Sequence, residues 1–156
     1  MAIEVGDKAP DFTLKDTDGN DFHLYDAIKD GPVLVNFYIG DFGINCTMYM
    51  NKFIERYDEF TALGVRMFAV NDNSMDSHKM FRDRMGAPYQ MLFDEGKKVA
   101  TQYGAIVGPG HMVSGFTNRE FYLVDKEGIV KYKWRSSIPK ELPEPDIILD
   151  GVKKAL

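Results

Sequence analysis

The residue with the clearest chemical potential is Cys46, the only cysteine among 156 residues, in the stretch FYIGDFGINCTMYM. A thiolate is a strong nucleophile, but an ordinary thiol with a pKa of about 8.5 is only slightly ionised at neutral pH. An apolar run precedes Cys46 and a helix-like pattern follows it, and a helix N-terminus favours a negatively charged group. This position predicts a reactive thiol, against the alternative of a buried, inert small hydrophobe.

Metal and cofactor chemistry finds little support. His23, His78 and His111 lie far apart and lack the short spacings typical of metal ligands. Met48 and Met50 follow Cys46 closely, but two residues that are two positions apart on a helix do not share a face. We therefore expect neither a metal nor a cofactor. A single cysteine also excludes an internal disulfide and a two-cysteine redox motif within one chain.

Periodicity predicts the elements that position Cys46. The run Pro32 to Ile39 is apolar on both faces apart from Asn36, which is typical of a central strand covered by helices. From Cys46 to about Leu63, apolar residues recur every three or four positions, which predicts an amphipathic helix. Because sites form where the carboxyl end of a strand meets the next helix, this junction is the predicted active site.

Strand and helix patterns alternate over the rest of the chain. Asp18 and Gly19 suit a hairpin turn between two short strands, and Ser74 can cap a helix through Met85. Further strands are predicted at 65–70, 88–94, 119–125 and 129–134, and further helices at 97–103 and from about 146. The glycine-rich segment 105–118 is predicted as a loop able to approach a ligand, and it contains His111.

This order of elements indicates an α/β fold with a mixed central sheet flanked by helices and an N-terminal β-hairpin, in one domain spanning 1–156. The net charge of -5, without clustered Lys or Arg, argues against nucleic-acid and anionic-membrane partners. The opening MAIEVGDKAP lacks the pattern of a secretory signal, and no apolar run approaches the roughly 20 residues of a membrane span. We expect a cytoplasmic protein.

The chain resembles the peroxiredoxins of the AhpC/TSA superfamily, and among them the bacterioferritin-comigratory type. The stretches that carry the resemblance are GDKAPDFTLKDTDGN, GPVLVNFYIGDF with the following NC, SMDSHKMFRDRMGAPYQMLFDEGKKVATQYGA, and REFYLVDKEGIV. The resemblance implies a thioredoxin-like fold over nearly the whole chain. It also implies that Cys46 is the nucleophile and that Arg119, at the head of REFYLVD, completes the catalytic pair.

The catalytic motif departs from the family pattern. Ile39 stands at the position of the family's proline and Gly43 at that of its threonine, whose hydroxyl bonds within the thiolate–peroxide cluster. Tyr49 takes the place of a frequent carboxylate, and Asn51 that of a common resolving cysteine. Losing one preorganised donor typically costs about 10²–10³ in rate. The resemblance therefore implies a slow or differently tuned thiol.

Other groups near the cysteine are candidates to bind substrate in place of that threonine. They are the phenol of Tyr38, the backbone at Gly43 and the amide of Asn45, with the phenol of Tyr49 as an alternative. Asp41 opposes the thiolate if it is charged and close, but a local hydrogen bond or cap in the loop is expected for it.

The implied function is reduction of hydrogen peroxide or small organic hydroperoxides by a one-cysteine mechanism. The sulfenic acid formed at Cys46 would need an external thiol or redoxin as reductant. The alternative is a peroxidase-impaired binding or redox-sensing module with the same fold. Peroxiredoxin-like folds occur in several assemblies, so a monomer or homodimer is expected.

Overall fold

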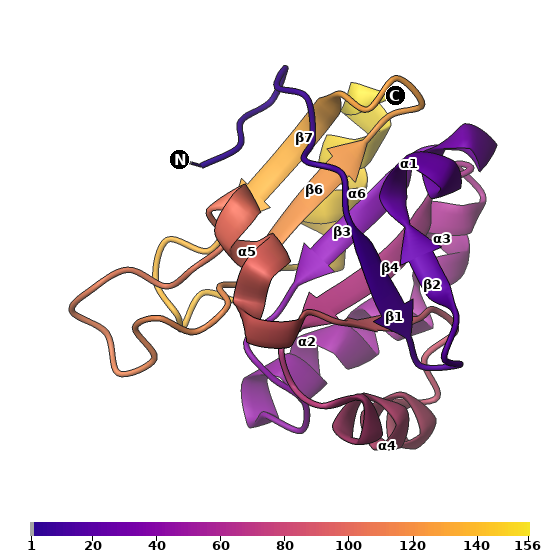
Figure 1. Cartoon of the computed structure of the whole chain (residues 1–156). Coiled ribbons are helices and arrows are strands. Elements are labelled where there is room, and N and C mark those ends of the chain that lie inside the picture. Colours follow the sequence, from indigo (N-terminus) through magenta and orange to yellow (C-terminus); the bar gives the residue numbers. More distant parts are fainter. Residues whose placement is uncertain (1) are drawn as a thin grey trace.

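The computed structural model describes residues 2–156 and arranges them around a seven-stranded mixed sheet (Figure 1). Strands β3, β4 and β5 are parallel to one another, and the remaining pairs are antiparallel. The strand order is β2-β1-β5-β4-β3-β6-β7. The strands are β1 (Thr13–Asp16), β2 (Asp21–His23), β3 (Val33–Phe37), β4 (Arg66–Asn71), β5 (Met91–Phe93), β6 (Glu120–Val124) and β7 (Val130–Arg135). The mixed sheet and the N-terminal hairpin confirm the predicted fold class.

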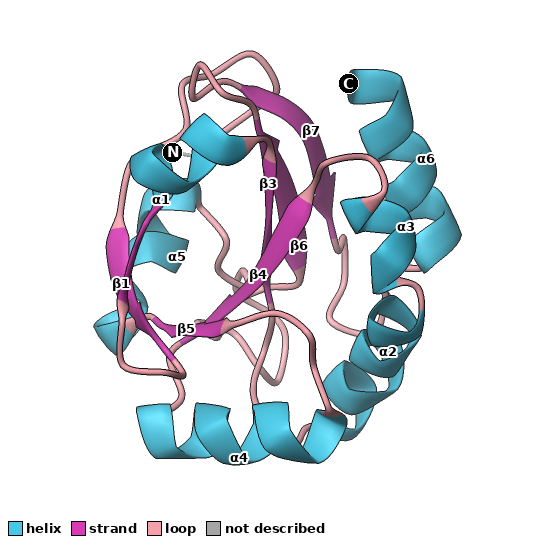
Figure 2. Cartoon of the chain, turned by 90° about the vertical axis from the view of Figure 1, so that its right-hand side faces the viewer, coloured by secondary structure: helices cyan, strands magenta, loops and turns pink. Residues whose placement is uncertain are grey.

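Helices cover both faces of the sheet (Figure 2). They are α1 (Leu24–Ala27), α2 (Ile44–Glu55), α3 (Tyr57–Thr61), α4 (Met75–Met85), α5 (Lys98–Tyr103) and α6 (Pro145–Ala155), with 3₁₀ turns at Ile28–Asp30 and Glu95–Lys97. Alternate residues of β3 belong to two hydrophobic cores, because successive side chains of a strand point to opposite faces. One core contains buried side chains of α2, α3, α4 and α6, and the other those of α1 and α5. β3 is buried along its whole length, as its apolar sequence predicts.

Helix α4 begins and ends where its sequence predicts. Ser74 is its N-cap, and its hydroxyl accepts a hydrogen bond from the main-chain N–H of Ser77. Gly86 follows the last turn in the left-handed conformation, which a residue without a Cβ adopts at little cost. These caps fix the length of α4, whose residues contact the active-site loop described below.

The helix predicted from Cys46 to Leu63 is wrong at both ends and is not continuous. α2 begins two residues earlier, at Ile44, and ends at Glu55, and α3 follows after Arg56, whose φ of -110° and ψ of 13° leave the helical region. The break allows the hydroxyl of Tyr57 to accept a hydrogen bond from the main-chain N–H of Met67 in β4, at 3.1 Å. This long-range contact leaves no trace in local periodicity.

Candidate active site

Cys46 lies in the first turn of α2, directly after the loop that leaves β3. Gly43 is the N-cap, with φ -62° and ψ 139°, and as a glycine it has no side chain with which to cap the helix. The main-chain N–H groups of the first turn have no acceptor within a helix. They favour an anion at this end of α2, which is where the Cys46 sulfur lies.

Arg119 reaches the same end of the sheet through strand pairing. β6 runs antiparallel to β3, with Glu120 opposite Phe37. The residue before β6 is therefore level with the carboxyl end of β3, where the loop toward Cys46 begins. Arg119 is 3% exposed, and its guanidinium donates to the main-chain carbonyl of Pro139. Its Nε is buried and has no hydrogen-bond partner among residues 2–156.

A cavity of about 410 Å³ joins Cys46 and Arg119. Its wall also includes two of the predicted substrate-binding residues, Gly43 and Asn45. The other lining residues are Ile39, Gly40, Asp41, Ile44, Asn73 and Phe116. Cys46 is only 2% exposed, so the cysteine lines this cavity as a buried residue rather than lying on the open surface. Within the described residues, no hydrogen bond joins Arg119 to the sulfur, and the cavity that both residues line has room for a small ligand.

A second cavity, of about 580 Å³, adjoins the first and shares Ile39, Asn45 and Arg119 with it. The loop at 105–118 contributes His111, Met112 and Val113, and the loop after β7 contributes Ile138, Pro139 and Lys140. Both loops extend from the same side of the molecule in Figure 1. The glycine-rich segment thus lies beside the site, as its composition predicts. The walls are mostly apolar side chains, which suits an organic group.

Tyr38 and Tyr49 are both fully buried, and neither lines the Cys46 cavity. The Tyr38 hydroxyl donates to Asp41 at 2.5 Å, and the Tyr49 hydroxyl donates weakly to Asn36 at 3.5 Å. Burial raises the pKa of Tyr49, the charge of Cys46 adds to this effect, and the charge of Arg119 opposes it. Cys46 and Arg119 are therefore both within electrostatic reach of this phenol, one turn beyond the cysteine.

The structure adds long-range partners to the local role expected for Asp41, which accepts a hydrogen bond from Tyr38, three residues before it. Its carboxylate accepts hydrogen bonds from Ser77 at 2.7 Å and is 2.6 Å from Nδ1 of His78, both in α4. Its main-chain N–H donates to Asn73 at 2.7 Å. The sequence did not predict His78, Ser77 and Asn73 as partners of Asp41. They lie more than 30 residues away along the chain, and local periodicity carries no information about contacts at that separation. The remaining missed lining residues, Phe116 and 138–140, lie in loops without periodicity.

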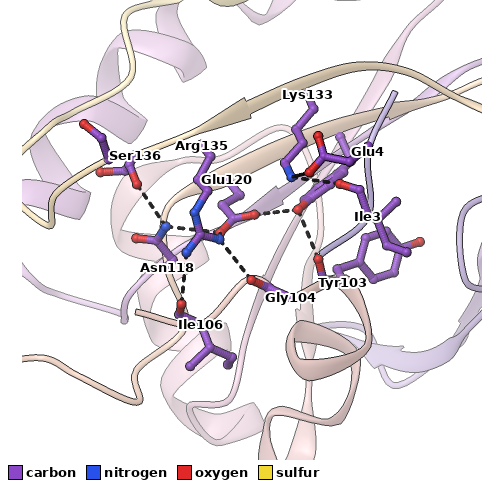
Figure 3. A network of polar contacts seen from close by, with 12 residues as sticks. Ile3, Glu4, Tyr103, Gly104, Ile106, Asn118, Glu120, Lys133, Arg135 and Ser136 are labelled. Carbon is purple, nitrogen blue, oxygen red and sulfur yellow. Dashed lines mark hydrogen bonds and ion pairs between the residues drawn. The ribbon is translucent and has the colours of Figure 1, made fainter. Parts of the chain in front are cut away.

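Behind Arg119, a polar cluster fixes the ends of β6 and β7 (Figure 3). Glu120 follows Arg119 and is fully buried, bonded to Arg135, to Nδ2 of Asn118 at 3.1 Å and to the Tyr122 hydroxyl at 2.5 Å. Arg135 also donates to the main-chain carbonyls of Gly104 and Ile106, and Asn118 donates to that of Ser136. These bonds hold the strand from which Arg119 projects into the site.

Glu120 makes the stability of this cluster dependent on pH. Burial, the largest effect, raises its pKa above the ordinary value of 4.5, while the Tyr122 hydroxyl and Arg135 oppose the rise. Folding therefore favours the protonated form. The stabilising contribution is complete below about pH 4.5 and is lost as pH rises through the folded pKa.

We expect the stability advantage of the wild type over Glu120→Gln to shrink as pH rises from 4.5 toward 8, because Gln does not titrate. Urea unfolding of both proteins across this range measures the difference. Glu127→Gln, at an exposed carboxylate in the β6–β7 turn, is the control for general pH effects. A difference that stayed constant or grew with pH would show that pairing with Arg135 outweighs burial.

No metal centre emerges from the part of the chain that the structure covers. No group of three or more His, Cys, Asp or Glu side chains within residues 2–156 is arranged to hold a metal ion. Met50 is buried in the core, whereas Met48 is exposed on the outer face of α2. Over the same residues, no helix combines the length and the apolar character needed to cross a bilayer.

Known proteins with similar sequences point to one family. The AhpC/TSA family model matches residues 5–133. Peroxiredoxin Q from the chloroplast of Oryza sativa subsp. japonica is 32% identical over 139 residues, which are 89% of this chain and 62% of the plant protein. The chain thus spans less than two thirds of the length of that relative.

Solved structures agree on the fold. A mutant of the PrxQ protein of Xylella fastidiosa superposes with a TM-score of 0.87 at 16% identity over 99% of this chain and 98% of that one. Bacterioferritin comigratory protein of Xanthomonas campestris gives a TM-score of 0.83 at 21% identity over 99% and 98% of the two chains. From the sequence match and these thioredoxin-like neighbours, we conclude that this chain belongs to the AhpC/TSA family and has the peroxiredoxin fold.

Proposed function

We propose that this protein is a thiol peroxidase that reduces hydrogen peroxide and small organic hydroperoxides through Cys46. The observation that carries the proposal is the shared cavity, which brings together the cysteine, the first turn of α2 and an arginine with an unbonded Nε. The helix N-terminus and the guanidinium both favour the thiolate over the thiol. They also face the region where negative charge develops as a peroxide bond breaks.

In the first step, the Cys46 thiolate attacks one oxygen of the hydroperoxide. An S–O bond forms, the O–O bond breaks, and the second oxygen leaves as hydroxide or alkoxide and takes up a proton as water or alcohol. The cysteine becomes a sulfenic acid. Arg119, which lines the cavity, supplies guanidinium N–H donors for the reacting oxygens, and the N–H groups at Asn45 and Cys46 are further donors from the helix end.

A one-cysteine cycle follows because the chain contains no second cysteine to form an internal disulfide. An external thiol attacks the sulfenic sulfur, forms a mixed disulfide with Cys46 and releases water. A second external thiol then attacks the mixed disulfide, which restores Cys46 and releases the oxidised reductant. A small thiol or a redoxin fits this role. The cytoplasmic location and the monomeric or dimeric state stay predictions.

The adjoining cavity favours organic hydroperoxides over hydrogen peroxide. Its apolar walls begin at Arg119 and Ile39, so a substrate whose peroxide group lies at Cys46 can extend its organic group there. The solved Xanthomonas neighbour is described for alkyl peroxide reduction activity, which agrees with this preference.

A second function is favoured by two observations. Cys46 is 2% exposed, and Gly43 provides no hydroxyl at the cavity wall. With a buried thiol and no hydroxyl at position 43, Cys46 would react with peroxide too slowly for catalytic turnover, and the protein would serve as a redox-sensing or binding module. The rate of the first oxidation separates the two functions.

The test is stopped-flow oxidation of the reduced protein by hydrogen peroxide and by cumene hydroperoxide, with Cys46→Ser as the control. We expect the wild type to react faster than free cysteine thiolate, more so with cumene hydroperoxide, and the variant not to react. Rates no faster than the free thiolate with both oxidants would reject the peroxidase and favour the sensing module.

A further inference from the structure

A buried polar cluster lies beneath the loop that leads from β3 to Cys46. We define it as the Asp41 cluster, consisting of Tyr38, Asp41, Asn71, Ser77 and His78. The side chains of Asp41 and His78 are 1% and 0% exposed. The carboxylate takes part in three contacts, with the Tyr38 hydroxyl at 2.5 Å, the Ser77 hydroxyl at 2.7 Å and Nδ1 of His78 at 2.6 Å. The cluster ties the loop to both β4, through Asn71, and α4, through Ser77 and His78.

The same residues hold the loop in an uncommon backbone conformation. Asn71 donates through Nδ2 to the main-chain carbonyls of Tyr38 at 2.8 Å and Ile39 at 2.9 Å. Phe42, next to Asp41, has a φ of 60°, which is rare for a residue with a bulky side chain. Such a conformation persists only where the surroundings determine it. The Asp41 cluster supplies those surroundings, directly before the helix that carries the cysteine in its first turn.

The hydrogen-bond partners of His78 determine how many protons the pair holds. Nε2 lies 3.1 Å from the main-chain carbonyl of Asn71, which can only accept, so Nε2 carries a hydrogen. Nδ1 lies 2.6 Å from the Asp41 carboxyl group, a contact that needs one hydrogen between the two atoms. That hydrogen belongs either to an imidazolium facing a carboxylate or to a carboxylic acid facing a neutral imidazole. In both arrangements the pair has no net charge.

Neutrality matters because Asp41 also lines the Cys46 cavity. Burial raises the pKa of Tyr38, and the charges of Asp41 and Cys46 both add to the rise, so both groups are near this one hydroxyl. An uncompensated carboxylate there would oppose a thiolate, since like charges disfavour ionisation. His78 removes that opposition while it leaves the carboxylate free to hold the loop.

We propose that His78 is a positioning residue for Cys46: with Asp41 it forms a buried, net-neutral pair that fixes the active-site loop and keeps the aspartate from opposing the thiolate. The ionisable or charged groups that face the pair or the cysteine are Tyr38 directly after β3, Tyr49 from α2 and Arg119 directly before β6. None of these three groups carries a negative charge at neutral pH, so Asp41 is the one acid among the groups near the cysteine that could oppose its thiolate.

The test is the pH dependence of Cys46 alkylation by iodoacetamide in wild type, His78→Gln, Asp41→Asn and the double variant. His78→Gln leaves the carboxylate without its counter-charge, so we expect the pH midpoint of alkylation to rise by about one unit. Asn at position 41 keeps the shape without the charge, so Asp41→Asn and the double variant should lie within a few tenths of a unit of the wild type. If His78 had a purely structural role, adding Asp41→Asn to His78→Gln would not be expected to restore the alkylation midpoint.

An unchanged midpoint in His78→Gln, or a double variant as shifted as that single variant, would overturn the proposal. If His78→Gln does not fold, the proposal attributes the failure to the unpaired buried carboxylate of Asp41. The double variant lacks that carboxylate and should therefore fold. Failure of both would contradict the proposal. The inference rests on Cys46 being the reactive thiol of the proposed function, but alkylation needs no peroxide turnover. If the wild type were inactive toward peroxides but the double variant still restored the alkylation midpoint, the peroxidase function would be rejected and the positioning role of His78 would stand.

Discussion

Replacing Arg119 by Met is expected to slow the oxidation of Cys46 by peroxide about 10²–10³-fold. The guanidinium is the cationic group that shares the cavity with the cysteine, and its Nε has no other acceptor within residues 2–156. Methionine fills a similar space without charge or donor. Without the guanidinium, the thiolate loses its counter-charge, and so does the negative charge that develops on the peroxide oxygens. Both losses slow the oxidation of Cys46.

The rate is measured by quench-flow, with mass spectrometry of the dimedone adduct of the sulfenic acid. Arg119→Lys keeps the charge but loses the planar donor group, and it should recover only part of the rate. Arg66→Met is the matched control. Arg66 begins β4 opposite Val33, the first residue of β3, so it lies at the other end of the strands, and it also donates to a main-chain carbonyl, that of Ala27 at 2.7 Å. Wild-type rates in Arg119→Met would show that the arginine is only structural.

Replacing Gly43 by Thr is expected to accelerate Cys46 oxidation by about 10²–10³-fold. The peroxiredoxins that this chain resembles carry a threonine there. A Cβ at Gly43 would meet only the carbonyl oxygen of Gly40 at 3.7 Å and the Cβ of Cys46 at 3.9 Å, which are ordinary contacts. The backbone, with φ -62° and ψ 139°, is normal for threonine. The site therefore accommodates the hydroxyl.

Gly43→Val is the matched control, because valine has the shape of threonine without the hydroxyl. Gly43→Thr should match the wild type in stability to within a few tenths of a kcal/mol, whereas Gly43→Val, with a poor capping residue, should be less stable by about 1 kcal/mol. The same quench-flow assay compares their rates. Equal rates for the Thr and Val variants would mean that backbone donors at the start of α2 already serve in place of the hydroxyl.

Much of the fold could be predicted because its elements have local causes. The apolar run of β3 requires cover on both faces, and the structure buries every residue of that strand. Ser74 and Gly86 bound α4 through contacts within a few residues. The position of Cys46 at a strand-to-helix junction also follows from local periodicity. Residue order alone thus determined the mixed sheet, most element positions and the place of the thiol.

The tertiary structure decided what surrounds that thiol. The register of β3 and β6 brings Arg119 level with the loop that leads to Cys46, and the packing of α4 on that loop brings His78 against Asp41. The break at Arg56 likewise depends on a contact of Tyr57 with β4. Periodicity reports which face of an element is buried, but not which distant element covers it. Charge compensation inside the site is a property of such distant pairs, so it was visible only once the chain was folded.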